Sequence, residues 1–161
     1  TTELHGIWWY RVRRMVDPVQ YALIPAHVTL CREDELSELA AVQTRLEQMQ
    51  FAPIVLTFGL PERFDGHGLL LPCIQGEPAF HRLRACLLGT REIRNQAPHI
   101  TLAHPRNPQA VANVPGMALP LAAGMQIAFN SINLIEQIDH DPWTVLARWA
   151  LNGGEGMPLP E

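Results

Sequence analysis

The sequence predicts an α+β fold of two lobes, in which mostly antiparallel sheets face a central cleft and helices lie on the outside. Two observations lead to this prediction. A short motif occurs twice, as His27-Val28-Thr29-Leu30 and as His99-Ile100-Thr101-Leu102, with a proline just upstream of each copy. Segments with helix and strand periodicity follow each copy in a similar order, which indicates pseudo-two-fold symmetry with one motif strand from each lobe near the axis.

Composition and charge limit the class of protein. The 161 residues, 47% hydrophobic and 17% charged, suffice for one globular domain, expected over residues 1–152 with a flexible tail over 153–161. The net charge of −4 argues against a basic surface that binds long duplex nucleic acid. Three cysteines without CxxC spacing, and no apolar stretch typical of a membrane span or signal peptide, predict a cytoplasmic protein without membrane association. A monomer is also expected.

The first part of the chain combines strand and helix patterns. Aromatic and β-branched residues predict a strand over 6–13, and residues 17–24 then connect it to the first motif strand at 26–31. Asp34 occupies the N-cap position of a helix whose apolar spacing continues to Met49. Three polar residues are predicted on the exposed side of this helix: Gln43, Arg45 and Glu47.

The middle of the chain predicts a hairpin and a second helix. Residues 54–58 and 69–74 have strand character, and the turn residues 65–68 between them favour an antiparallel hairpin. A helix is predicted from Pro78 to Gly89, since proline fits a first turn and glycine a C-terminal stop. Its inward-facing residues are expected to be Phe80, Leu83 and Leu87.

The second motif strand begins after Pro98, and the rest of the chain predicts a loop and a hairpin. Residues 105–124 are predicted to form a loop with a short helix at 109–112. Residues 125–137 predict one long strand, and residues 143–151 predict a last strand that pairs back to it.

The two motifs carry the residues suited to acid and base chemistry. Side chains alternate along a strand, so each motif places a histidine and a threonine on one face and aliphatic residues on the other. A histidine has an unperturbed pKa of roughly 6.5, so one of a pair can act as a neutral base and the other as a charged acid. Threonine hydroxyls can donate to oxygens where negative charge develops. The predicted polar site therefore consists of His27, Thr29, His99 and Thr101.

Histidines and cysteines in strands are also common as purely structural residues or as metal ligands. A single His-x-Thr on a strand is most often a hydrogen-bonded polar residue of a sheet face, and only the matched pair favours a site. His99 and His104 are close enough in sequence to suggest a metal, but no cysteine or acidic residue lies at zinc-like spacing, so no metal is expected. Cys31 shares the face of His27 and lacks a base partner that would make it a nucleophile.

The paired motifs resemble the twin H-x-[T/S]-x signature of the two-histidine (2H) phosphoesterases, a superfamily that includes bacterial RNA 2′,3′-cyclic phosphodiesterases, also called 2′-5′ RNA ligases. The resemblance extends over residues 7–151 and implies a catalytic pair, His27 and His99, with Thr29 and Thr101 at the phosphate. It implies metal-independent opening of cyclic phosphates at RNA 3′ ends or on small nucleotides, without a cofactor. His99 is assigned as base and His27 as acid, and the reverse assignment stays open.

Four further residues are candidates for substrate binding. His104 follows the second motif where some 2H enzymes contact the phosphate, Arg32 is a possible phosphate ligand, and Trp9 and Trp143 are candidates for stacking a nucleobase. A loop histidine, a solvated arginine and core tryptophans remain the alternatives. Two rival functions also remain: 2′-5′ ligation or cleavage at the same site, and a non-catalytic nucleotide- or RNA-binding module.

Overall fold

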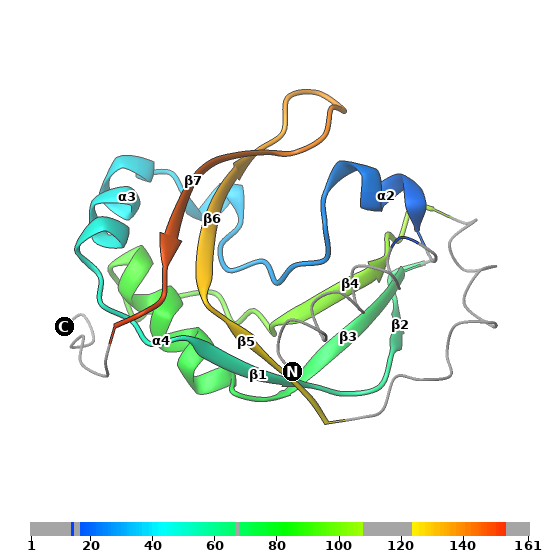
Figure 1. Cartoon of the computed structure of the whole chain (residues 1–161), viewed down its shortest axis with the longest axis horizontal. Coiled ribbons are helices and arrows are strands. Elements are labelled where there is room, and N and C mark those ends of the chain that lie inside the picture. The colour runs from blue at the N-terminus through cyan, green and yellow to red at the C-terminus, as the bar shows by residue number, and fades with distance from the viewer. Residues whose placement is uncertain (1–13, 15–16, 67, 108–123, 154–161) are drawn as a thin grey trace.

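A computed structural model of the chain describes residues 14, 17–66, 68–107 and 124–153 (Figure 1). The predicted strand at 6–13, the predicted short helix at 109–112 and residues 154–161 of the predicted tail lie outside the described residues.

The architecture is α+β with antiparallel strands, which confirms the predicted fold class. The described residues form a five-stranded sheet and a separate two-stranded sheet. In chain order the elements are α2 (Pro18–Leu23), the 3₁₀ helix η1 (Glu33–Glu35), α3 (Leu39–Gln48), β1 (Ile54–Phe58), β2 (Glu62–Phe64), β3 (Gly68–Gln75), α4 (Glu77–Leu88), β4 (His99–Ala103), β5 (Met125–Phe129), β6 (Ser131–Glu136) and β7 (Thr144–Ala150).

Strand β3 organises the larger sheet, because it pairs antiparallel with β1, β2 and β4, while β5 adds to β1. The pairing of β1 with β3 confirms the predicted partnership of residues 54–58 and 69–74. An additional strand, β2, lies between β1 and β3 in sequence and pairs with β3. The chain turns from β2 into β3 through Asp65 and Gly66, which both have positive φ.

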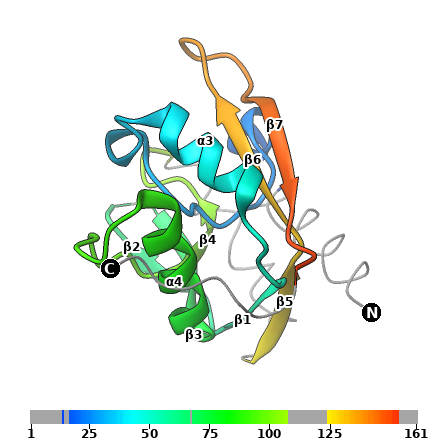
Figure 2. The same cartoon turned by 90° about the vertical axis from the view of Figure 1, so that its left-hand side faces the viewer.

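The hydrophobic core lies between this sheet and the two longer helices. Figure 2 shows α3 and α4 next to each other beside the sheet. The predicted inward face of α4 is confirmed, and the helix ends at Gly89 in the left-handed conformation. The core joins residues from both helices and three strands: Val42, Leu46, Leu56, Phe58, Leu71, Phe80, Leu83, Leu87, Ile100 and Leu102.

The predicted single strand over residues 125–137 is wrong. The chain leaves the larger sheet at Asn130, so that β5 and β6 belong to different sheets. The Asn130 carbonyl accepts a hydrogen bond from the Leu151 N–H at 2.8 Å. This bond joins the residue between β5 and β6 to the residue that follows β7. Strands β6 and β7 pair as the predicted hairpin, which extends away from the larger sheet in Figure 1.

Residues 17–24 form a helix and not the predicted connector. The Asp17 carboxylate caps α2 by accepting the Gln20 N–H at 3.0 Å, and Pro18 occupies the first turn, where its missing N–H costs nothing. This Asp-Pro pair is an ordinary helix start, although the helix that follows is only six residues long.

The helix predicted from Asp34 begins later. Residues Glu33–Glu35 form the 3₁₀ helix η1, and α3 starts at Leu39 with Glu38 as its N-cap. The physical reason is the Glu35 carboxylate, which accepts the Arg32 N–H at 2.9 Å and pairs with an arginine of α4. These bonds hold η1 as a separate turn.

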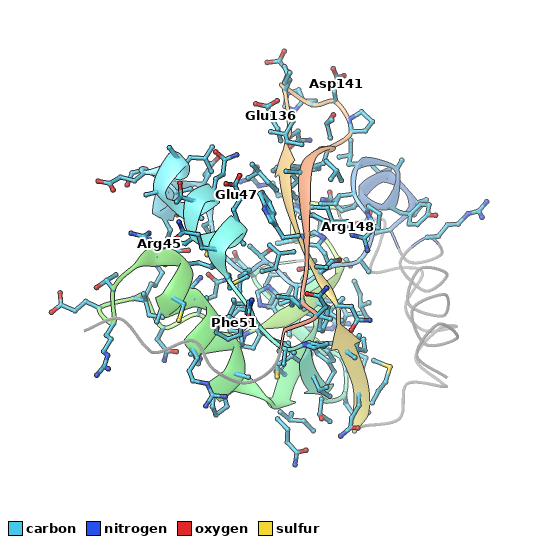
Figure 3. All side chains as sticks on the ribbon, turned by 60° about the vertical axis from the view of Figure 1, so that its left-hand side comes forward. Arg45, Glu47, Phe51, Glu136, Asp141 and Arg148 are labelled. Carbon is cyan, nitrogen blue, oxygen red and sulfur yellow. The ribbon has the colours of Figure 1, made fainter. Side chains whose placement is uncertain are left out.

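Arg45 is half-buried, contrary to the prediction of an exposed position, and comes from α3 on the side of α4 (Figure 3). Its Nη1 donates to the Leu87 carbonyl at 2.9 Å, one of the last carbonyls of α4. A positive charge at this end of a helix is favourable because the exposed carbonyls carry partial negative charge. Gly89 has φ of 69°, and a Cβ there would lie 2.5 Å from Arg45 Nη2.

Gly89→Ala is therefore expected to lower the free energy of unfolding for two reasons. The left-handed conformation costs a non-glycine residue about 1–2 kcal/mol, and the methyl group also displaces the Arg45 guanidinium. Gly124→Ala is the matched control, since Gly124 has φ of 91° and no atom of the described residues lies within 4 Å of its Cβ position. Urea unfolding should show a larger loss for Gly89→Ala, and equal losses would contradict the role of Arg45.

Candidate active site

The two motifs meet directly, because Val28 and Ile100 form an antiparallel bridge. One residue to either side of this bridge, the facing positions are His27 and Thr101 on one side and Thr29 and His99 on the other. The site is thus a four-cornered arrangement, with a histidine opposite a threonine at each end. Figure 1 shows the segment after α2 crossing the middle of the molecule near β4.

The alternation of side chains places these four residues on one face. Ile100 is 3% exposed and Val28 packs against the same core, so the bridge residues point inward. The two histidines and two threonines are half-buried on the opposite face. Diagonal residues of an antiparallel pair lie about 7–8 Å apart, and side chains of this length reach across that gap. A spacing of this size suits a single phosphate between the two imidazoles.

Both imidazoles have the same local hydrogen bond. His27 Nδ1 lies 2.8 Å from the Pro25 carbonyl, and His99 Nδ1 lies 3.0 Å from the Ala97 carbonyl. A carbonyl only accepts, so Nδ1 carries the hydrogen in each ring. The proton that a neutral ring accepts, or a charged ring donates, is therefore at Nε2 in both residues. The carbonyl two positions before each histidine thus determines the tautomer and the orientation of its ring.

The second motif forms the predicted strand, β4, which pairs with β3. The first motif does not form the predicted strand over 26–31, and Val28 is its one residue in a β-bridge. The carbonyls that a neighbouring strand would bind are instead occupied by side chains. Gln96 Nε2 donates to the Thr29 carbonyl at 2.9 Å, and Arg84 Nη1 donates to the Leu30 carbonyl.

Phe64, at the end of β2, is an aromatic neighbour of the site that the sequence did not reveal. Its ring centroid lies 6.3 Å from that of His99, tilted by 54°, and the side chain is half-buried. The ring lies against Gly68, where a Cβ would be 2.6 Å from Phe64 Cε1. Glycine at 68 therefore makes room for an aromatic surface beside the second histidine.

The backbone of His104, just after β4, is fixed by a buried carboxylate. Asp17 is 0% exposed. Its Oδ2 accepts a hydrogen bond from the backbone N–H of His104 at 2.9 Å, and its Oδ1 accepts one from the Asn107 side-chain Nδ2 at 2.8 Å. Arg106 N–H donates to His104 Nδ1 at 3.2 Å, so a neutral His104 carries its proton on Nε2. Asp17 thus connects α2 to the loop that follows β4, and only its helix-start pattern could have indicated a structural role.

The remaining candidates are less closely associated with the histidines. Trp143 is half-buried and lies just before β7. Its backbone N–H donates to the carbonyl of Leu23, the last residue of α2, at 2.9 Å. Arg32 is exposed at the start of η1. Trp9 lies outside the described residues.

Cys31 is half-buried at the end of the first motif. Burial raises the pKa of the Cys31 thiol to about 11, against a smaller lowering by the Arg84 charge. The thiol is therefore protonated near neutral pH, and a protonated thiol is a poor nucleophile.

The described residues hold no cluster of metal-ligating side chains. In the part of the chain that the structure describes, no three His, Cys, Asp or Glu side chains gather in a group that could hold a metal ion. Among those same residues, no helix combines the length and apolar character needed to cross a membrane.

A buried ion pair lies behind the first motif. Arg84 of α4 is 0% exposed, and its Nη2 lies 2.6 Å from Glu35 Oε1 in η1. The hydrogen bond from Arg84 lowers the pKa of the Glu35 carboxyl against an opposing effect of burial. One sequence signal could have found this pair: Arg84 follows Leu83 and lies one turn after Phe80, within the apolar stripe of its helix.

Fold and site together define an α+β protein with two equivalent histidines on facing, antiparallel segments. A sequence model of the 2′-5′ RNA ligase superfamily matches residues 3–140, and the chain belongs to this superfamily. The match confirms the resemblance to the 2H phosphoesterases that the paired motifs carry. No curated protein sequence matches the chain.

Solved structures show the same fold at low identity. E. coli LigT complexed with ATP superposes with a TM-score of 0.54 and 17% identity, over 89% of this chain and 92% of that chain. E. coli LigT complexed with NADP⁺ superposes with a TM-score of 0.52 and 17% identity, over 88% of this chain and 91% of that chain. A crystal structure described as a phosphoesterase superposes with a TM-score of 0.53 and 16% identity, over 89% of this chain and 93% of that chain.

The Arg84–Glu35 pair predicts a specific dependence of stability on pH. Because the folded-state pKa of Glu35 is lowered, its contribution is present above the unfolded-state value of about 4.3 and is lost as pH falls through the folded value. Glu35→Gln should therefore be less stable than wild type at pH 7, and the difference should shrink below about pH 4. Urea unfolding from pH 3 to 7 measures it, and a pH-independent difference would contradict the ion-pair account.

Proposed function

We propose that the protein is a metal-independent phosphodiesterase that opens 2′,3′-cyclic phosphates at RNA ends or on small nucleotides. The observation that carries this proposal is the bridge between Val28 and Ile100, which brings one histidine and one threonine from each motif to a common face. Membership in a superfamily named for 2′-5′ RNA ligases supports a phosphate ester at this site.

The proposed reaction divides the proton transfers between two rings. His99 Nε2 takes a proton from water as the water oxygen attacks phosphorus, and the bond from phosphorus to one ribose oxygen breaks. His27, starting as the imidazolium, gives its Nε2 proton to that leaving oxygen. The sum is addition of one water to give a phosphate monoester and a hydroxyl. Thr29 and Thr101 donate to the non-bridging oxygens, where negative charge grows.

A second candidate uses the same groups. In 2′-5′ ligation a ribose hydroxyl replaces water as the attacking group and the histidines keep their roles, whereas in the reverse reaction, cleavage of the 2′-5′ linkage, they exchange them. The superfamily's name and the identical hydrogen bonds at the two Nδ1 atoms favour this alternative over a non-catalytic module, since binding alone does not need two matched imidazoles.

We propose a cytoplasmic site of action for a monomeric, single-domain protein over residues 1–152. All three cysteines, Cys31, Cys73 and Cys86, are free thiols, which suits a reducing compartment. The substrate would be an RNA terminus or a nucleotide, because the net charge of −4 disfavours long duplexes.

The first experiment measures turnover of 2′,3′-cyclic nucleotides and of a 2′-5′ dinucleotide across pH, with and without a chelator. A bell-shaped, chelator-resistant profile is expected. His27→Ala and His99→Ala should each lower kcat by about 10²–10⁴-fold, because each removes one proton transfer. His140→Ala, at an exposed turn position, is the control and should leave kcat unchanged. Loss in only one of the two site variants would contradict shared catalysis, and nucleotide binding without turnover would favour a binding module.

Phe64 is expected to stack against the substrate base, since its ring lies beside His99 on a half-buried surface. Base stacking on an aromatic ring contributes about 1–3 kcal/mol by alanine substitution. Phe64→Ala should therefore raise KM for a cyclic nucleotide at least several-fold, with a smaller effect on kcat. A five-membered cyclic phosphate without a base is the control substrate. An equal KM increase for both substrates would show that Phe64 acts on the phosphate site and not on the base.

A further inference from the structure

Arg84 makes more contacts than an ion pair requires. Besides Glu35, its guanidinium donates to the Leu30 carbonyl, to the Arg94 carbonyl at 3.2 Å and to Gln96 Oε1 at 3.3 Å. A buried ion pair is often no more stabilising than apolar residues of the same size, because both charges lose their hydration. Burial of a full charge at this position thus suggests a requirement beyond stability.

The network holds the backbone of the first motif. Gln96 Oε1 accepts from Arg84, so its amide is turned with Nε2 toward the Thr29 carbonyl, 2.9 Å away. Arg84 itself binds the next carbonyl, that of Leu30. Because the motif pairs with β4 at one bridge, these side chains replace the second strand neighbour that a regular sheet would provide.

The same network holds the approach to the second motif. The Arg94 carbonyl and the Gln96 side chain both bind Arg84, and the chain then passes through Ala97, whose carbonyl orients the His99 ring. Through Glu35, the network also fixes the Arg32 N–H just after the first motif. One buried guanidinium therefore binds the segments on which both histidines depend.

We propose that Arg84, acting with Gln96, is a positioning residue that sets the separation and orientation of His27 and His99. This inference rests on the proposed function for its kinetic consequences. A displacement of about 1 Å between reacting groups can lower a rate by about 10²-fold, while substrate binding changes less. The planar fork of arginine is needed, because lysine supplies one compact charge and cannot bind several acceptors in fixed directions.

The experiment compares three variants of the full chain. Arg84→Lys keeps the charge and removes the fork, and Gln96→Met removes the bond to Thr29 while leaving the ion pair. Both should lower kcat by about 10- to 100-fold per folded molecule, with KM within about twofold of wild type. Arg45→Met is the matched control, since Arg45 also binds a main-chain carbonyl of α4, away from the motifs. It should lower stability and leave kcat unchanged.

A second measurement separates this inference from the proposed function. In ¹H–¹³C NMR spectra, the imidazole signals of His27 and His99 should shift in Arg84→Lys and Gln96→Met, while that of His140 should not. If wild type opens no cyclic phosphate, the proposed function fails and the spectra still test the positioning role. If wild type is active and the folded variants keep both its kcat and its histidine spectra, the positioning role is wrong. If Arg84→Lys does not fold, Gln96→Met decides.

Discussion

The bridge between Val28 and Ile100 is the constraint on which the site depends. Burial of the two aliphatic side chains directs them into the core, and strand alternation then forces the neighbouring histidines and threonines onto the opposite face. The hydrophobic effect thus determines the polar constellation, since a shift of one residue in register would bury the imidazoles and expose the aliphatic residues. The polar face and the core are two sides of the same pairing.

The two copies of the motif are equivalent in sequence but supported in different ways. The second copy is a regular strand whose neighbour is β3, so the backbone ladder fixes His99. The first copy lacks such a ladder, and its carbonyls are bound by a charged side chain and an amide. A ladder is made of backbone groups that every residue possesses, whereas Arg84 and Gln96 are specific side chains. The position of His27 is therefore more sensitive to substitution than that of His99.

The spacing of apolar residues was sufficient to predict those elements whose local pattern alone decides their structure. The apolar stripe of α4, the strand of the second motif and the β6–β7 hairpin could all be predicted in this way. It failed where a distant side chain decides the local structure. The division of residues 33–48 into η1 and α3 depends on Glu35 meeting Arg84, about fifty positions later, and the break at Asn130 depends on Leu151. The motif histidines could be found because they repeat, but Phe64 and Asp17 belong to no repeat and their roles arise only from tertiary contacts.

The equivalent hydrogen bonds of the two histidines bear on the direction of the reaction. Each ring is oriented by the carbonyl two residues before it, so neither local geometry favours the acid or the base. In the part of the chain that the structure describes, the ring of Phe64 lies beside that of His99 and gives this histidine an aromatic neighbour. A base stacked there would direct which ribose oxygen lies next to which imidazole. Under the proposed function, the orientation of the substrate, and not the intrinsic chemistry of either histidine, would assign the roles of acid and base, and replacing water by a ribose hydroxyl as the attacking group would change hydrolysis into ligation.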